Sequence, residues 1–465
     1  MTWVLRGHRV LVDGALRPAA LHVDGTRIAA ITAYDDPRVD AEAVSHRVEA
    51  GDHVVSPGVV DAHVHINEPG RSEWEGFATA TEAAAAGGIT TVVDMPLNCI
   101  PATTHRAAAE TKRASLRDQL HVDVAFWGGV VPDQEAGDWR DLDGLAEFGV
   151  AGCKCFLCPS GVDEFGHVAA RHLDAALPRL RDLGLPLIAH AEAPGPLDAA
   201  EAALALERVQ GGADPRRYDT YLRSRPEQAE IEAIALLIEL ARKHRARVHV
   251  VHLAAAGAVP LIAEAQQQGV AISAETCLHY LTFAAEEIED GATFAKCAPP
   301  IRSADNRERL WKALADGPVS MVVSDHSPCT PQLKRLEQGD FMAAWGGIAG
   351  LQLGLSALWT GASARGHDVA TMARWHAEAT ADLVGLGGRK GRLRVGYDAD
   401  IVVWDDLAEH TVQQADIRHR HKLTPYQGRT LKGRVHQTYV GGKLAYDAVR
   451  GFASRPVGSF VAVRR

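Results

Sequence analysis

Six residues of metal-ligand or acid–base type stand at or near the ends of short apolar runs in this sequence. They are His63, His65, Lys154, His190, His252 and Asp325. Imidazole nitrogens and carboxylate oxygens are ligands that zinc and similar divalent ions accept. Such an ion lowers the pKa of bound water to about 7, which supplies a nucleophile at neutral pH. The set therefore indicates a divalent metal site that activates water.

The spacing of these residues supports convergence on one site. His63 and His65 are two positions apart, so in a strand both imidazoles point to the same face. His252 ends an apolar run and His249 is out of phase with it, which favours His252 as the ligand and His249 as a core or supporting residue. Asp325 follows the apolar run 319–324, where a carboxylate can bind a metal and accept a proton from its water.

Lys154 stands inside the apolar stretch Gly152–Leu157. A buried ammonium is costly, so such a lysine must pair, lose its proton or be modified. A neutral amine can add carbon dioxide and become an anionic carbamate that binds metals through oxygen. An ordinary lysine whose ammonium reaches solvent is the alternative, and taken alone Lys154 does not decide between them.

Three cysteines near Lys154 offer a second kind of site. Cys153, Cys155 and Cys158 suggest a thiolate zinc centre, but strand alternation turns the first two away from Lys154. A structural zinc site also needs a fourth ligand, which is missing here. We interpret these cysteines as small apolar core residues.

The intervening pattern predicts the scaffold that positions the six residues. Short apolar runs alternate with helical segments, as in βα units around a parallel sheet. We expect strands that end near His65, Met95, Val131, Phe156, His190, His252, His279 and Asp325. Eight such units predict a (β/α)8 TIM-type barrel of class α/β, whose active site lies at the carboxyl ends of its strands.

Both chain ends predict β structure of another kind. Residues 21–28 alternate around an Asp-Gly turn, and a second hairpin pattern flanks Gly441–Gly442. We expect a small β-sandwich formed by residues 1–55 and 386–465, with the barrel over residues 56–385. Ser224–Glu227 resembles a capping box ahead of an amphipathic helix.

Composition excludes several classes of function. The chain has 465 residues, a formal net charge of −10 and no apolar run long enough to span a bilayer, which disfavours nucleic-acid and membrane partners. Seven cysteines in so long a chain do not make a disulfide scaffold. We therefore expect a cytoplasmic location.

Several longer stretches resemble the cyclic amidohydrolases of the binuclear metal amidohydrolase superfamily. The similar stretches are Asp61–Gly70, Trp74–Gly76, Asp94–Asn98, Lys154–Phe156, Lys296–Arg302, Ser324–Cys329 and Trp345–Gly350. Within the family they are most similar to the members that open the hydantoin ring of allantoin to give allantoate. Leu278 and Ala379 depart from residues common in the family, Pro and Asn respectively.

The resemblance implies two metal ions, zinc by default, with cobalt, iron or manganese as alternatives. His63, His65 and Asp325 would hold one ion, His190 and His252 the other, and Lys154, as N6-carboxylysine, would bridge them. Asp325 would also carry the proton. A homo-oligomer, with a tetramer favoured, is implied as well.

The resemblance also bears on the substrate. Dihydroorotases carry an Arg at the position of Asn67, and hydantoinases place a Tyr shortly after the lysine, where this chain has Leu157–Ser160. We therefore expect a neutral cyclic ureide, bound by Asn98, Ser160 and backbone groups without a cation. A hydantoinase or dihydropyrimidinase activity and a catalytically silent scaffold are the alternatives.

Overall fold

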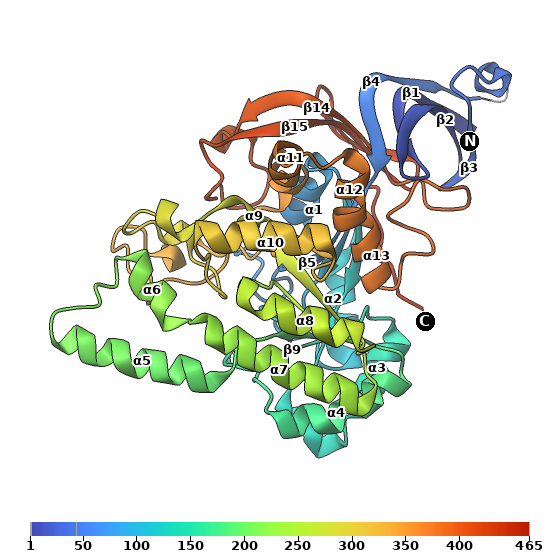
Figure 1. Ribbon diagram of the computed structural model, residues 1–465. Helices are drawn as coiled ribbons and strands as arrows, with labels where there is room; N and C mark the ends of the chain where they lie inside the picture. The colour runs from blue at the N-terminus through green and yellow to red at the C-terminus, as the bar shows by residue number, and fades with distance from the viewer. Residues whose placement is uncertain (1, 43, 465) are drawn as a thin grey trace.

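A closed ring of parallel strands occupies the middle of the chain in the computed structural model, which describes residues 2–42 and 44–464 (Figure 1). The strands are β5 (Val59–Val64), β6 (Ile89–Asp94), β7 (Asp123–Phe126), β8 (Gly128–Gly129), β9 (Cys153–Phe156), β10 (Leu187–His190), β11 (Val248–Val250), β12 (Ile272–Cys277) and β13 (Met321–Val323). Only Trp127 separates β7 from β8, so together they fill the third of eight positions.

Hydrogen bonds run from β5 through β7 and from β8 through β13. Backbone pairing between β5 and the segment after β13 closes the ring, since His65 N donates to His326 O at 2.8 Å. Every residue of β5, β6 and β9 is buried, as expected for strands covered on both faces. The predicted (β/α)8 barrel is confirmed.

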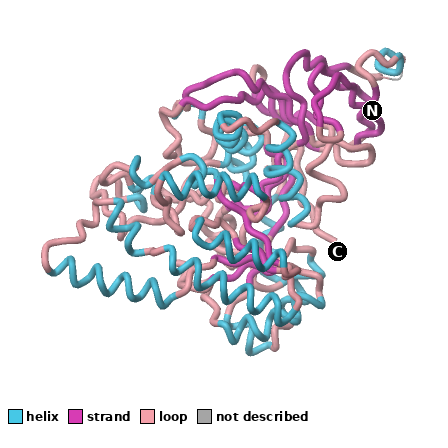
Figure 2. Tube along the Cα trace, in the orientation of Figure 1, coloured by secondary structure: helices cyan, strands magenta, loops and turns pink. Residues whose placement is uncertain are grey.

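Helices surround the ring and follow its strands in sequence (Figure 2). They are α1 (Phe77–Ala86), α2 (Arg106–Leu116), α3 (Asp141–Phe148), α4 (Ala170–Asp182), α7 (Glu227–His244), α8 (Val259–Gln267), α10 (Ala304–Asp316) and α11 (Gly354–Ala364). Additional helices are α5 (Pro194–Val209), α6 (Tyr218–Ser224), α9 (Leu278–Thr282), α12 (Val369–Ala373) and α13 (Ala379–Leu383). α5 and α6 lie in the long connection between β10 and β11, next to the cavity described below.

Both chain ends form the predicted β-rich domain. Its strands are β1 (Thr2–Val12), β2 (Ala15–Asp24), β3 (Arg27–Thr32), β4 (Arg47–Pro57), β14 (Ile401–Thr411), β15 (Thr430–Val440), β16 (Lys443–Asp447) and β17 (Gly451–Phe452). They pair in one continuous sheet of order β17-β16-β15-β14-β4-β1-β2-β3, which curls over its own apolar core (Figure 1). The predicted hairpins β2–β3 and β15–β16 are confirmed.

A buried ion-pair cluster ties this sheet to the barrel. Lys390 Nζ lies 2.8 Å from Asp123 of β7, 2.6 Å from Asp400 and 3.2 Å from Asp398. Residues 458–463 then leave the sheet and run beside β7, where Val461 N donates to Val124 O at 2.8 Å. The C-terminal segment therefore helps to fix the barrel.

Several strands end two residues before the residues near which we expected their ends, and one expected helix cap was wrong. The third strand position ends at Gly129 rather than near Val131. β12 ends at Cys277, so His279 lies in the first turn of α9. β11 ends at Val250, two residues before His252. Ser224 ends α6 and its hydroxyl donates to Tyr221 O, so it does not cap α7, which Pro226 precedes.

Among the described residues, no helix is both long enough and apolar enough to cross a bilayer.

Candidate metal centre

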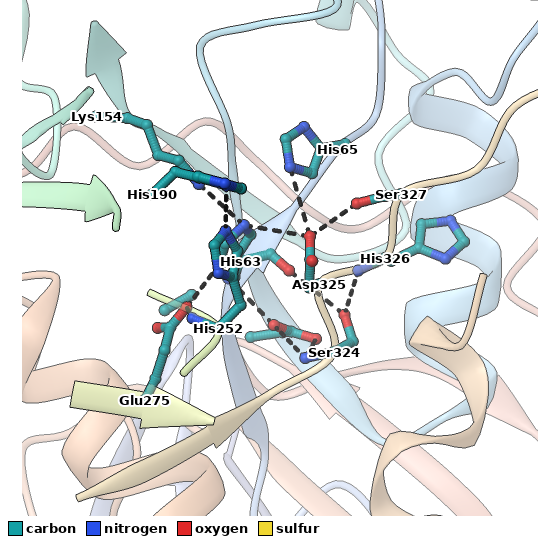
Figure 3. A network of polar contacts seen from close by, with 12 residues as sticks. His63, His65, Lys154, His190, His252, Glu275, Ser324, Asp325, His326 and Ser327 are labelled. Carbon is teal, nitrogen blue, oxygen red and sulfur yellow. Dashed lines mark hydrogen bonds and ion pairs between the residues drawn. The ribbon is translucent and has the colours of Figure 1, made fainter. Parts of the chain in front are cut away.

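The six predicted residues all lie at the carboxyl ends of barrel strands and are all buried (Figure 3). His63 lies in β5, Lys154 in β9 and His190 at the end of β10. His65, His252 and Asp325 follow β5, β11 and β13 by one or two residues. His252 and Asp325 have φ angles of 41° and 42°, so each turns its side chain back over the ring where the strand geometry ends.

His63, His65 and Asp325 form the tightest group. Asp325 Oδ1 lies 3.2 Å from His63 Nε2 and 3.5 Å from His65 Nε2. Ligands about 2.0–2.2 Å from a tetrahedral zinc ion lie roughly 3.3–3.5 Å from one another. The spacing of these three donors therefore fits one ion.

His190 and His252 form a second group. His190 Nδ1 lies 3.0 Å from His252 Nε2, again near the separation of two ligands of one ion. The other ring nitrogen of His252, Nδ1, is buried without a hydrogen-bond partner. An unsatisfied buried nitrogen is rare in native proteins, and Nε2 is the atom of His252 that faces His190.

Lys154 connects the two groups. Its Nζ lies 3.4 Å from His63 Nε2 and 5.1 Å from the centre of the Phe156 ring, and it forms no ion pair with a carboxylate of the described residues. Burial lowers the pKa of Lys154 to about 8, although the charges of Asp325 and Glu275 oppose this effect. A substantial fraction of the amine is therefore neutral near pH 8, as addition of carbon dioxide requires.

Two buried glutamates fix the orientation of ligand-type histidines. His63 Nδ1 lies 2.6 Å from Glu275 Oε1, and His190 Nε2 lies 2.6 Å from Glu192 Oε2. A carboxylate accepts the proton of the nearer ring nitrogen, which leaves the lone pair of the other nitrogen, His63 Nε2 or His190 Nδ1, for the cluster. Both glutamates have a weak sequence signal, namely an acidic residue within an apolar strand or shortly after one.

Both glutamates also contact a second side chain. Glu275 Oε2 also lies 3.1 Å from His249 Nε2, so the predicted supporting role of His249 is consistent with the structure. Glu192 Oε1 accepts from Arg225 Nε at 3.0 Å. Burial raises the pKa of Glu192, but Arg225 and His190 outweigh burial and lower that pKa to about 2. Glu192 is therefore an anion at neutral pH.

The protonation of the cluster suits metal binding. Burial, together with the charge of Lys154, holds the pKa values of His63 and His65 well below their usual range. Burial also raises the pKa of Asp325 to about 7, while Lys154 and the Ser327 hydroxyl, which donates to Oδ1 at 2.7 Å, oppose it. Neutral imidazoles are the form that binds metal ions.

The thiol alternative gains little support. Cys158 lies near His190 and Glu192, but burial raises the pKa of its thiol to about 12. Cys277 and His279, which sequence reasoning did not propose as ligands, lie near Asp325. Burial raises the pKa of Cys277 well above its usual value, and only the thiolate binds a metal well.

A cavity of about 450 Å³ opens above the cluster. Asn98 and Ser160 line it, as predicted, and Asn98 Nδ2 lies 3.5 Å from His65 Nδ1. Asn67 does not line it, because its side chain is buried against Pro328 O. Arg225 and Lys296, which the sequence analysis did not name, are also part of the cavity wall.

A parallel α/β barrel with histidines, a lysine and a carboxylate clustered at its carboxyl end has the design of barrel hydrolases that use metal ions. Comparisons with known proteins agree with this class of enzyme. The amidohydrolase family model matches residues 54–445. The chain belongs to the amidohydrolase family.

Individual relatives match over nearly the whole chain. An allantoinase of Streptomyces avermitilis is 47% identical over 95% of this chain and 94% of its own length. An allantoinase of Saccharomyces cerevisiae is 41% identical over 97% and 96%, respectively. Among solved structures, an L-hydantoinase (dihydropyrimidinase) from Arthrobacter aurescens superimposes with a TM-score of 0.92 at 29% identity, covering 99% of this chain and 100% of the other.

Proposed function

We propose that this enzyme hydrolyses the hydantoin ring of allantoin to give allantoate, a step of purine and ureide breakdown. One observation carries the proposal. A chain that is 47% identical to an allantoinase over 95% of its length also places all six ligand-type residues in one buried cluster beneath a cavity.

We infer that the cluster holds two divalent ions, zinc first, with cobalt, iron or manganese as alternatives. His63, His65 and Asp325 would hold one ion, and His190 and His252 the other. The donor separations of 3.0–3.5 Å within each group support this division. When bound, the ions supply an acidified water and a Lewis acid for the ring carbonyl.

We also infer that Lys154 carries a carbamate. Its neutral Nζ would form a bond to the carbon of carbon dioxide and release one proton, so that an anionic oxygen ligand replaces the ammonium. The absence of a carboxylate ion pair in the described part of the chain supports this, because an unmodified ammonium there would be buried and unpaired.

The position of Asp325 supports a role in moving the proton of this reaction. It lies at the cluster and lines the cavity, and Ser327 orients its Oδ1 atom. We propose that Asp325 accepts a proton from the attacking water and returns it to the ring nitrogen that leaves. Asn98, which borders the same cavity, would hydrogen-bond the substrate.

Two alternatives predict other results. The TM-score of 0.92 to an L-hydantoinase favours a hydantoinase-type cyclic amidase as the second candidate. A silent scaffold would tolerate loss of the cluster, whereas this chain keeps all six residues.

The test is incubation of the metal-loaded protein with allantoin, followed by quantification of the ring-opened acid. Allantoate is expected, and unchanged allantoin would overturn the proposal.

We further propose a cytoplasmic homo-oligomer, with a tetramer favoured. Cys99, Cys155, Cys158, Cys277, Cys297 and Cys329 are buried thiols outside any disulfide, which suits a reducing compartment. Leu206 and Val209 are 69% and 89% exposed three residues apart on α5, and we propose that a second subunit covers this surface. Light scattering of the purified protein tests the oligomer, and a monomer would contradict it.

A further inference from the structure

Two lysines are buried at the wall of the cavity without the partners that buried cations usually have. Lys296 is 8% exposed and Lys334 is 4% exposed. Neither forms an ion pair with a carboxylate in the part of the chain that the structure describes. Backbone carbonyl oxygens surround them instead.

Lys296 belongs to the cavity wall. Its Nζ donates to Ala344 O at 2.5 Å and to Met342 O at 3.2 Å, and it lies 4.9 Å from the centre of the Tyr221 ring. Lys296 and these three neighbours all line the cavity. An ammonium has three N–H donors, so two carbonyl partners leave one donor for a ligand.

Lys334 plays a different part although it is buried as deeply. Its Nζ donates to Lys296 O at 3.4 Å, to Trp345 O at 3.1 Å and to Gly347 O. Lys334 does not line the cavity. Lys334 therefore holds the backbone of the cavity wall in place without contacting the cavity, whereas Lys296 is itself part of the wall.

The other charged groups of the wall are already engaged or lie in solvent. Arg225 donates hydrogen bonds from Nε and one terminal nitrogen to the Glu192 carboxylate. Asp198 and Glu201 also line the cavity, but both are exposed on α5 and neither pairs with Lys296. Lys296 is therefore a buried donor with unused capacity.

Keeping this cation is costly to the fold. Burial, together with the charges of Lys334 and Arg225, lowers the pKa of Lys296 to about 7, although the charge of Asp340 opposes this effect. The two carbonyls and the face of the Tyr221 ring offset only part of the free-energy cost of burying the ammonium. A hydrogen-bond acceptor on a bound ligand would offset the rest of that cost.

We propose that Lys296 is the specificity-determining residue that donates a hydrogen bond to the ureido carbonyl oxygen of the substrate; this rests on the function proposed above. In the part of the chain that the structure describes, no hydrogen bond, ion pair or ring contact joins Lys296 to any of the six clustered residues. It therefore meets the ligand away from the carbonyl that reacts at the cluster. Plain hydantoin lacks the ureido arm and would leave Lys296 unpaired.

The test compares Lys296→Met with the wild type on allantoin and on hydantoin. A hydrogen bond from a charged donor is worth enough that its loss lowers kcat/KM by about 10- to 100-fold. We expect kcat/KM for allantoin to fall by about that factor more than kcat/KM for hydantoin, mainly through KM. Lys296→Gln, which keeps an N–H donor of similar reach, should restore part of the preference.

Lys334→Met is the matched control, because it removes an equally buried lysine that contacts only backbone. It should lower both activities alike. Metal content and circular dichroism establish that each variant is folded and loaded, and Lys296→Gln serves alone if Lys296→Met does not fold. Equal losses of kcat/KM on both substrates in the Lys296 variants would overturn the role proposed for Lys296 but not the proposed function. Failure of the wild type to hydrolyse allantoin would overturn the proposed function and, with it, this role.

Discussion

His63 Nε2 lies 3.2 Å from Asp325 Oδ1, although one residue lies in the first barrel strand and the other follows the last. The two residues meet because backbone pairing between β5 and the segment after β13 closes the ring. The same closure brings His65 within 3.5 Å of Asp325. The integrity of the centre therefore depends on the seam of the barrel.

Removal of the metal ions should abolish activity. The proposed centre needs about two ions per chain, as two-metal hydrolases require. Dialysis against a chelator, followed by elemental analysis and assay, should show activity falling with metal content and returning when zinc is added. Full activity in protein that contains no metal would contradict the proposed centre.

Replacing Asp325 by Asn should lower kcat by about 10²- to 10⁴-fold, the usual cost of losing a general base. The amide keeps the size of the side chain and one oxygen ligand, but it cannot take up the proton. The measurement is steady-state kinetics on a variant whose metal content has been determined. If kcat stays near the wild-type value with the metals bound, Asp325 is not the proton carrier.

Lys154→Ala should lose both metal and activity, because the bridging carbamate can no longer form. Short carboxylic acids added in solution should restore part of each, since a carboxylate offers the same pair of oxygens. Lys154→Arg, which keeps the positive charge but cannot form the carbamate, is the matched control and should not be rescued. Rescue of neither metal binding nor activity in Lys154→Ala would argue against the carbamate.

Glu192→Ala should weaken metal binding by about 10- to 100-fold, the usual effect of removing a group that orients a metal-binding histidine. Glu192 accepts from His190 Nε2 at 2.6 Å, so without it the ring can turn and change tautomer. Competition with a metal indicator measures the affinity directly, and Glu192→Gln, which retains an acceptor oxygen, should be the milder variant.

Lys390→Met provides the control for that experiment. Lys390 is fully buried between Asp123, Asp398 and Asp400, and breaking such a pair costs about 3–5 kcal/mol of folding stability. Thermal unfolding should show this loss while metal affinity is retained. An equal loss of metal affinity in Lys390→Met and Glu192→Ala would mean that Glu192 acts only through stability.

The sequence was sufficient to predict the barrel and the convergence of its ligand-type residues. Parallel strands buried on both faces leave apolar runs that are easy to recognise, and polar residues at their ends must meet at one face. Strand alternation was less reliable for His249 and His252. His252 lies beyond β11 with a φ of 41°, so the period of two no longer applies to it.

Contacts between distant segments could not be predicted in the same way. Glu275 meets His63, and Lys296 meets Met342 and Ala344, only because separate strands and loops pack together. Arg225 and Lys296 were not identified as cavity residues for this reason, because the segments that contain them reach the cavity only through the packing of the fold.

The most direct test of the account is the kcat/KM of the metal-loaded wild type for allantoin, hydantoin, dihydrouracil and dihydroorotate, measured side by side. We predict the highest value for allantoin, because groups that bind its ureido arm would be left unpaired by the others, and such mismatches can cost several orders of magnitude. A higher kcat/KM for hydantoin, dihydrouracil or dihydroorotate than for allantoin would contradict the proposed substrate but not the proposed metal centre.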